Sequence, residues 1–593
     1  MDSMQSRREL SRVIRASLRM LPQTTRRRLW LLLPMQAGVA LMDVFGIVLL
    51  TSMLSVVATG SENGIDGYVL IELGPFSTTL ESNRILPLAA FGAALLTIRP
   101  ILSLIILRRS ARILADAQSD LAADLSTRYL FLSPALARQR NSNSVAFALA
   151  DGVTFLIVGV LGGAIVLVTE AFILVGLTAV LFAANWFIAL VSLTFFTLVG
   201  FALNRYVVGR SRLIGVRLGE LQIQGRIDMQ NALGTLREAH VLDLKHAVGA
   251  PFRQNRRSIS TVAADGMYYG LLPKYLLEVA LIVQLALVTS ILFILYPAQD
   301  AFAQLSLFAL ASLRIIPSFQ RVQNAAISIV TQGNSAGETL LIWQTASRVE
   351  PTMPVTREAE ESLVAGRTSL AAPEVRVSNL TVQYPGATTP ALVDISFTVN
   401  AGSLVIVTGE SGSGKTTLLD ALMGLIPWKA GSVQIGGLVP GGYFSAAPGA
   451  SSYLPQQVYL IDGTLKENLS WPLPPVAYSD DDYWDSLELV GASSFARALP
   501  KCLDEQLGEW GGRLSGGQRQ RINFARALMS KPSLLFVDEA TSALDPESES
   551  VVLELLRRLK GNVTILAVTH RSTHLSIADT SICLAEGRIV TRP

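Results

Sequence analysis

A glycine-rich loop containing a lysine is the feature of this sequence with the clearest chemistry. A β-branched run at 405–408 precedes it and a run of helix formers at 418–425 follows it. Glycines let consecutive backbone N–H groups point at phosphate oxygens, and the following helix turns its positive end toward them. The sequence therefore predicts a nucleoside-triphosphate site whose loop residues are Gly409, Glu410, Ser411, Gly412, Ser413, Gly414, Lys415, Thr416 and Thr417. Lys415 would bind the β- and γ-phosphates, and the Thr416 hydroxyl would bind Mg²⁺.

Two adjacent carboxylates complete the predicted chemistry. Asp538 and Glu539 directly follow the apolar run 534–537, which reads as a buried strand. In a parallel sheet covered by helices, the carboxyl ends of strands face the ligand crevice. We therefore expect Asp538 to hold Mg²⁺ and Glu539 to act as the general base that polarises the attacking water.

Residues 373–593 resemble the nucleotide-binding domain of an ATP-binding cassette (ABC) transporter. The resemblance rests on the phosphate loop, on the two carboxylates and on the pentapeptide Leu514–Gln518. It implies that Tyr384 stacks on adenine, that Gln456 touches Mg²⁺, and that His570 is the switch histidine. It further implies a dimer-interface loop containing Asp545. The same resemblance assigns contact with the γ-phosphate of the opposite subunit to the signature residues Ser515, Gly516, Gly517 and Gln518.

The resemblance also implies that the chain works in pairs. In that family the signature of one copy completes the phosphate loop of the other, and this chain contains one of each. Since Glu539, His570 and the signature all match the active pattern, we expect a homodimer with two competent ATP sites. A heterodimer with a related chain is the alternative.

Composition indicates that the remainder of the chain lies in a membrane. Of 593 residues, 50% are hydrophobic and only 16% are charged, and the mean hydropathy is +0.42. Soluble proteins carry nearer a quarter charged residues. Charges are sparse between 29 and about 330 and dense after 349. The net charge of +3 gives no reason to expect a nucleic-acid partner. Cys502 and Cys583 have no partner at metal-site spacing and read as free thiols.

Six apolar runs are long enough to cross about 30 Å of hydrocarbon. They lie near 29–59, 85–107, 147–179, 181–207, 270–296 and 301–330, with a turn expected near Ala184–Asn185. Basic residues crowd the N-terminus, 108–140, 205–257 and the region after 330, whereas 60–84 is acidic. Because basic loops mark the cytoplasmic side, we expect both termini in the cytoplasm and a multi-pass protein of the bacterial inner membrane.

We therefore expect a polytopic α-helical membrane domain followed by an α/β P-loop ATPase domain. The domain boundaries predicted from composition are 1–28 for a cytoplasmic segment, 29–344 for six transmembrane helices with cytoplasmic extensions, 345–372 for a linker and 373–593 for the ATPase domain. The six-span part resembles the membrane domain of type IV, exporter-like ABC transporters. Two short contact helices are expected within Arg128–Leu136 and Asn231–Leu244.

Charged residues inside the predicted spans are costly, so they indicate pairing or function. They are Asp43, Arg99, Glu170, Glu278 and Arg314. One hypothesis pairs Asp43 with Arg99, which fall at similar depth on adjacent spans. The other places Arg99 and Arg314 in a cavity, where they bind an anionic head group. The sequence leaves open which of these residues contact substrate and which contact only each other.

Short stretches such as Leu313–Ser318 resemble bacterial lipid-linked oligosaccharide flippases. The resemblance implies an ATP-driven exporter or flippase that works by alternating access on a lipid-linked or amphipathic substrate. Exporters of peptides, drugs or lipids and exporter-fold importers share the same motifs, so substrate and direction stay open. A further alternative is an ATPase that uses its spans only as an anchor.

Overall fold

In a computed structural model the chain forms two compact units, one of residues 1–132 and 137–351 and one of residues 133–136 and 352–593. The structure describes residues 13–59, 68–73, 76–81, 85–132, 134–137, 140–347, 371–384, 387–472, 478–508, 511–539, 546–569 and 571–590. The division between the units falls inside 345–372, the segment for which the sequence predicts a linker.

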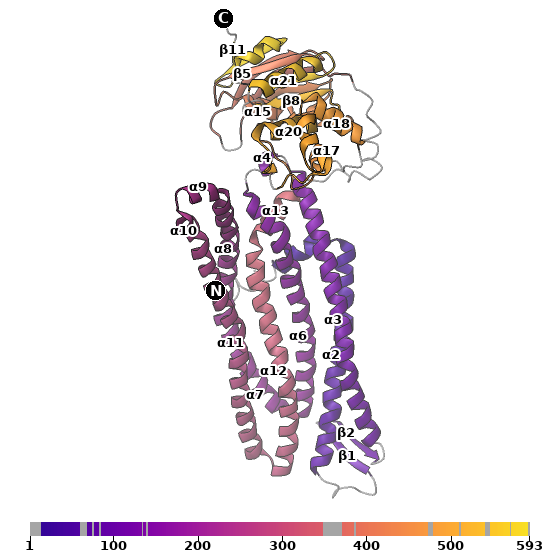
Figure 1. Cartoon of the computed structure of the whole chain (residues 1–593). Coiled ribbons are helices and arrows are strands. Elements are labelled where there is room, and N and C mark those ends of the chain that lie inside the picture. Colours follow the sequence, from indigo (N-terminus) through magenta and orange to yellow (C-terminus); the bar gives the residue numbers. More distant parts are fainter. Residues whose placement is uncertain are drawn as a thin grey trace. The chain divides into compact units, whose positions relative to one another are not determined.

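Long helices make up the first unit (Figure 1). They are α2 (Gln23–Thr59), α3 (Ile85–Leu130), α6 (Gly162–Ala184), α7 (Trp186–Leu203), α8 (Gly209–Gly234), α11 (Ala250–Leu295) and α12 (Ala298–Ser335). Between them lie short helical pieces: α5 (Ser142–Phe147), α9 (Leu236–Val241), α10 (Lys245–Val248) and α13 (Gly337–Ala346), with π-helical turns at Ala148–Gly152, Phe155–Leu161 and Asn204–Val208. The short helix α4 (Pro134–Ala137) also lies between α3 and α5 in sequence, but most of it groups with the second unit. An antiparallel hairpin, β1 (Tyr68–Leu73) and β2 (Phe76–Glu81), occupies the acidic loop, and no secondary structure was predicted there.

Among the described residues, four helical stretches are long and apolar enough to cross a membrane, judged by length and composition. They are Ala90–Leu130, Ser142–Ala183, Trp186–Gly234 and Lys245–Leu295. These overlap the predicted second to fifth spans. The predicted first and sixth spans run along α2 and α12, where the side chains of several residues lie outside the described set. The predicted turn is confirmed, because Asn185 ends α6 in an extended conformation with φ −154° and ψ 101°.

Glycines bring α8 and α12 into backbone contact. A Cβ atom at Gly215 would lie 2.3 Å from the carbonyl oxygen of Thr331, and one at Gly219 would lie 3.1 Å from that of Ser335. The Ser335 hydroxyl donates to the Gly215 carbonyl at 2.8 Å. Small residues at a helix interface permit this close approach, which is how membrane helices gain van der Waals packing.

The second unit contains two β-sheets. The larger has the strand order β11-β10-β5-β9-β8-β7, and the smaller has the order β4-β3-β6. Their strands are β3 (Val375–Val382), β4 (Leu392–Val399), β5 (Leu404–Gly409), β6 (Ala430–Ile435), β7 (Ser451–Leu454), β8 (Leu534–Asp538), β9 (Thr564–Val568), β10 (Thr580–Ala585) and β11 (Arg588–Val590). Neighbours from β10 to β7 are parallel, which confirms the predicted mostly parallel sheet. The antiparallel three-stranded sheet was not predicted.

Helices cover both faces of the larger sheet, so its central strands are buried on both sides. The helices of this unit are α15 (Lys415–Leu422), α16 (Pro440–Ala446), α17 (Leu465–Ser470), α18 (Asp480–Leu489), α19 (Ser493–Ala498), α20 (Gly516–Met529) and α21 (Pro546–Leu559). Successive residues of one strand alternate between two cores: Leu404 and Ile406 enter one, Val405 and Val407 the other. This double burial explains why these strands read as continuous apolar runs.

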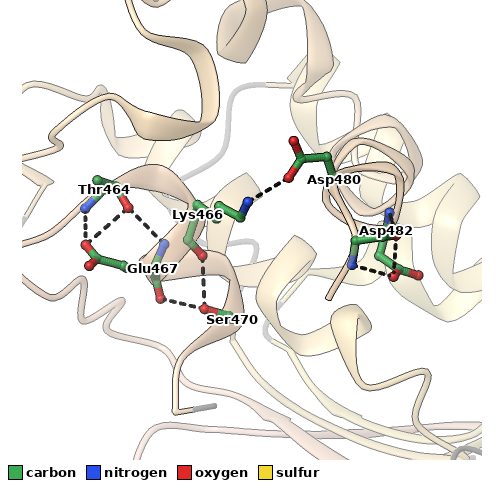
Figure 2. A network of polar contacts seen from close by, with 7 residues as sticks. Thr464, Lys466, Glu467, Ser470, Asp480 and Asp482 are labelled. Atoms are coloured by element: carbon green, nitrogen blue, oxygen red, sulfur yellow. Dashed lines mark hydrogen bonds and ion pairs between the residues drawn. The ribbon is translucent and has the colours of Figure 1, made fainter. Parts of the chain in front are cut away.

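Two capping boxes fix the helices that follow β7. The Thr464 hydroxyl accepts from the backbone N–H of Glu467, whose carboxylate accepts from the N–H of Thr464, and Ser479 and Asp482 form the same exchange at α18. Lys466 joins the two helices through an ion pair with Asp480 at 2.6 Å (Figure 2). Capping satisfies N–H groups that lack partners within the helix, so short α17 begins at a defined residue.

Candidate nucleotide-binding site

The predicted phosphate loop, the two carboxylates and the predicted loop glutamine lie at one edge of the larger sheet. In the order of the strands, the phosphate loop follows β5, Thr569 follows β9, Asp538 and Glu539 end β8, and Gln456 follows β7. Because these strands are parallel neighbours, their carboxyl ends share one edge. The Glu539 N–H donates to Val568 at 3.1 Å, which ties the carboxylate segment to β9.

The phosphate loop is held open by glycines and by its own lysine. Gly409, Gly412 and Gly414 have φ values of +151°, +83° and +102°, a region that favours residues without a Cβ. The buried Lys415 ammonium donates to the carbonyls of Gly409 at 3.0 Å and Glu410 at 2.8 Å. These bonds join the two ends of the loop.

Lys415, Asp538 and Glu539 lie close enough to influence one another in a partly buried space. Burial lowers the pKa of Lys415, while Glu539 and Asp538 oppose that shift. Burial raises the pKa of Asp538, and the neighbouring Glu539 raises it further, whereas a hydrogen bond from Tyr453 at 3.4 Å acts in the opposite direction. A cation and a carboxylate that both lose solvation are each stabilised by a ligand of opposite charge.

Glu539 is placed and oriented by two features of the backbone and of a neighbouring loop. Its φ is +46°, a left-handed conformation that costs a non-glycine residue roughly 1–2 kcal/mol and is concentrated at functional sites. The Gln456 amide donates to the Glu539 carboxylate at 2.9 Å. The structure thus brings together the predicted general base and the predicted loop glutamine, which lie 83 positions apart in sequence.

Tyr384 lies beside the helix that follows the phosphate loop. Its hydroxyl is 3.2 Å from the Thr417 hydroxyl, and 39% of the tyrosine remains exposed. An exposed aromatic ring next to the phosphate loop is suited to stack on a nucleobase. This position agrees with the role that the resemblance implies for Tyr384.

The signature pentapeptide forms the exposed start of α20. The Ser515 hydroxyl accepts from the Gln518 N–H at 3.2 Å, and the Gln518 side chain accepts from the Ser515 N–H at 2.9 Å. Ser515 and Gly516 are exposed, Gly517 and Gln518 half-buried. Further along α20, Arg526 donates to the carbonyls of Asn468 and Tyr459, and burial lowers its pKa to about 10. The signature helix is therefore anchored to the segment that follows Gln456.

Two predicted residues, Asp545 and His570, lie outside the described residues. Their neighbours reveal a contact that sequence reasoning missed. Glu549, in the first turn of α21, accepts from Arg571 and forms a hydrogen bond with His574 Nε2 at 2.9 Å. A carboxylate is only an acceptor, so His574 Nε2 carries the proton. The sequence offered one indication of this contact, which is that Glu549 closely follows the predicted Asp545 and Arg571 directly follows the predicted His570.

Charged residues of the first unit have different surroundings. Buried Glu170 pairs with Arg321 of α12, which also donates to Ser318 at 3.3 Å; the sequence had not singled out Arg321. Arg99 and Arg314 are half-buried and Glu278 is exposed. The Asp43 side chain lies outside the described residues, so its predicted pairing with Arg99 stays a prediction.

The described residues fit a nucleotide with its magnesium ion. The buried Ser413 hydroxyl has no hydrogen-bond partner among the described residues, and it lies in a loop rich in positive φ. A phosphate oxygen of a bound nucleotide would supply the missing partner. Among those residues, no cluster of three His, Cys, Asp or Glu side chains could hold a metal alone. Mg²⁺ commonly binds through one or two carboxylates plus phosphate oxygens, so Asp538 with Thr416 suits it.

Comparison with known proteins agrees with this geometry. Residues 392–542 match the sequence profile of the ABC transporter family. The fold is similar to that of a bacterial Atm1-family ABC exporter with ATP bound, with a TM-score of 0.74, 18% identity and coverage of 95% of this chain and 94% of that one. The chain therefore joins an ABC transporter ATP-binding domain to a helical membrane domain with an ABC exporter fold.

Curated relatives match over part of the chain. An ATP-dependent lipid A-core flippase of Photobacterium profundum is 35% identical over 236 residues, which is 40% of each protein. Proteins of the same name from Methylobacillus flagellatus and Xanthomonas oryzae pv. oryzae are 38% and 33% identical over 213 and 287 residues. The chain spans less than half of the length of these relatives, covering 36% and 46% of the latter two.

Proposed function

We propose that this protein is an ATP-driven exporter or flippase that acts on a lipid or another amphipathic molecule. One observation carries the proposal: a hydrolysis-type arrangement at the sheet edge, with Gln456 bonded to Glu539 and Lys415 in a glycine loop, occurs in a chain with an exporter fold. An ATPase that needed its spans only as an anchor would not require a membrane domain of this fold.

The residues have distinct roles in the proposed cycle. Lys415 and the loop N–H groups bind the β- and γ-phosphates, and Tyr384 stacks on adenine. Thr416, Asp538 and Gln456 would hold Mg²⁺, which supplies charge neutralisation for the phosphates when bound. Glu539 accepts the proton of the attacking water. His570 and Asp545 would act at the γ-phosphate and at the dimer interface, as the resemblance implies.

We propose that the working unit is a homodimer with ATP between the two copies. Ser515 and Gly516 are exposed, while the far end of their helix is fixed to β7 by a hydrogen bond from Ser452 to the Ala527 carbonyl. Strand β7 lies three positions from β5 in the sheet, which is about 14 Å at ~4.8 Å per strand. Because the signature lies on the β7 side of the sheet, away from the phosphate loop of its own copy, we propose that it contacts the phosphate loop of a second copy. The alternative partner is a related chain.

ATP binding would close the two copies, and hydrolysis would release them, giving alternating access. The short helix α4 overlaps the first segment predicted as a contact helix, and α9 lies within the second. Both are proposed to transmit this motion. We place the protein in the bacterial inner membrane with both termini in the cytoplasm, because the basic segments at 108–140 and 205–257 favour that side.

For the substrate we propose a lipid with an anionic head group. The curated relatives are named as lipid A-core flippases, which favours a lipid over a peptide or a drug. Arg99 and Arg314 would bind the head group inside the membrane, where charged side chains usually serve in pairing or in function. A lipid-linked oligosaccharide is one member of this class. Arg314→Gln should reduce the stimulation of ATPase activity by such a lipid, and unchanged stimulation would exclude Arg314 from the substrate site.

The deciding experiment measures lipid translocation and ATPase activity in proteoliposomes. ATP-dependent movement of a labelled anionic lipid between leaflets supports the proposal, and ATPase activity without movement supports the anchor alternative. Glu539→Gln should lower the ATPase rate by about 10²–10⁴-fold while ATP binding persists, because only the proton acceptor is removed. ATP hydrolysis at the parental rate by this variant would show that Glu539 is not the base.

A further inference from the structure

An arginine-lined hollow lies on α3, away from the nucleotide site. Its lining residues are Ile105, Arg108, Arg109 and Arg112, and its volume is about 350 Å³. The residues are spaced at i, i+3, i+4 and i+7, so they share one face of the helix. All three arginines are exposed, and none of the ion pairs that the structure resolves among described residues includes them.

The same helix face continues into an exposed apolar stripe. Ile98, Ile101 and Ile105 precede the arginines at helical spacing and are 53%, 58% and 52% exposed. They belong to the apolar run 85–107, whose length at ~1.5 Å per residue is roughly 34 Å, about the thickness of the hydrocarbon core. The arginines therefore begin where the hydrocarbon layer ends.

The charge on this face is confined to a short band. Asp116 is the next ionisable residue in the same register, one turn beyond Arg112, and it is exposed. The face thus presents apolar side chains, then three guanidinium groups, then a carboxylate. This order matches a phospholipid, whose acyl chains precede a phosphate along the membrane normal, and the carboxylate limits how far an anion can extend.

We propose that the Arg108–Arg109–Arg112 hollow binds the phosphate head group of an anionic bilayer phospholipid whose acyl chains lie along the isoleucine stripe. Guanidinium groups bind phosphate through paired N–H donors, and basic residues beside a membrane span attract anionic lipids. The proposal depends on α3 lying in a membrane and not on ATP-driven translocation. Failure of one can therefore be told from failure of the other.

The test is native mass spectrometry of the full chain in a non-ionic detergent, titrated with dioleoyl phosphatidylglycerol or dioleoyl phosphatidylcholine. The test variant is Arg109→Gln/Arg112→Gln. The matched control is Arg256→Gln/Arg257→Gln, which removes the same charge from exposed residues of α11 outside the predicted span 270–296. At about a fivefold step per basic residue, the loss of two arginines should make the first phosphatidylglycerol bind about 10- to 30-fold more weakly to the test variant. The control should match the parental protein.

Several outcomes would overturn the proposal. These are equal binding of the two lipids by the parental chain, parental affinity in the test variant, and an equal loss in the control. Displacement of phosphatidylglycerol by millimolar inorganic phosphate would indicate a free-anion site instead. A change in oligomeric mass without a change in lipid occupancy would show that a second copy covers this face. Arg109→Lys/Arg112→Lys retains the charge and should restore most of the binding, which separates loss of the site from misfolding.

Discussion

Replacing Glu549 by Gln should slow ATP hydrolysis without weakening ATP binding. Glu549 connects the segment after Asp545 to the segment after His570, because it contacts both Arg571 and His574. Its side chain is 12% exposed and that of His574 is 4% exposed, so both are largely shielded from water. A glutamine offers one acceptor oxygen, and its NH₂ group would face one of the two donors.

The expected magnitude follows from the bond that is lost. A hydrogen bond to a charged group contributes about 1.5–3 kcal/mol, and each 1.4 kcal/mol is a factor of ten. If most of this lost energy had held the segment after Asp545 and the segment after His570 in their arrangement for hydrolysis, kcat should fall about 10- to 30-fold. The KM for ATP should stay within about twofold, because Lys415 and Tyr384, the residues expected to bind ATP before hydrolysis, lie on other elements and keep their contacts.

The assay is steady-state ATPase activity of the full chain in nanodiscs over a range of ATP concentrations. Glu554→Gln is the matched control, since Glu554 is on the same helix but is 52% exposed, and its ion pairs among the described residues are with Arg557 and Arg558. Such surface pairs contribute about 0.3–0.5 kcal/mol, so the control should keep kcat within about twofold. Equal kcat values for the two variants, or a rise in KM alone, would refute the positioning role of Glu549.

Two further expectations concern the phosphate loop and the helix interface. Burial lowers the pKa of Lys415, and only the protonated lysine attracts phosphate. The affinity for a fluorescent ATP analogue should therefore fall as pH rises, and the pH at the midpoint of this fall should lie below the pKa of an ordinary lysine. Lys415→Arg stays charged and should lack this dependence; identical pH profiles would contradict the explanation. Gly215→Ala should lower the apparent thermal midpoint of the protein in detergent, since overpacking costs about 1–3 kcal/mol. Gly209→Ala should leave the midpoint unchanged, because a Cβ atom at Gly209 would meet nothing within 4 Å. A similar midpoint for both glycine variants would count against the close α8–α12 contact.

Much of the nucleotide site could be predicted because its parts are local in sequence. The phosphate loop needs a strand, glycines, a lysine and a helix in immediate succession, and 404–422 supplies them in that order. Asp538 was recognisable because an apolar run ends there. Such signals depend on short-range geometry, which the side-chain pattern encodes directly.

Contacts between distant segments were not accessible in the same way. The bond from Gln456 to Glu539, the anchoring of Arg526 on Asn468 and the pairing of Glu170 with Arg321 each join segments at least 58 positions apart. None of these pairs has a local pattern that identifies its partner. The antiparallel sheet β4-β3-β6 was missed for a related reason, because strand pairing depends on register between separate segments.

The sequence by itself determined which residues can hold a nucleotide and which segments are apolar enough to lie in a membrane. These properties follow from residue type and spacing along one stretch of chain. Only the tertiary structure decided that Gln456 faces Glu539, that Glu549 joins two loops of the site, and that Gly215 permits backbone contact between α8 and α12. The physical reason is that such contacts depend on how separate elements pack, and packing is set by the whole core and not by any single segment.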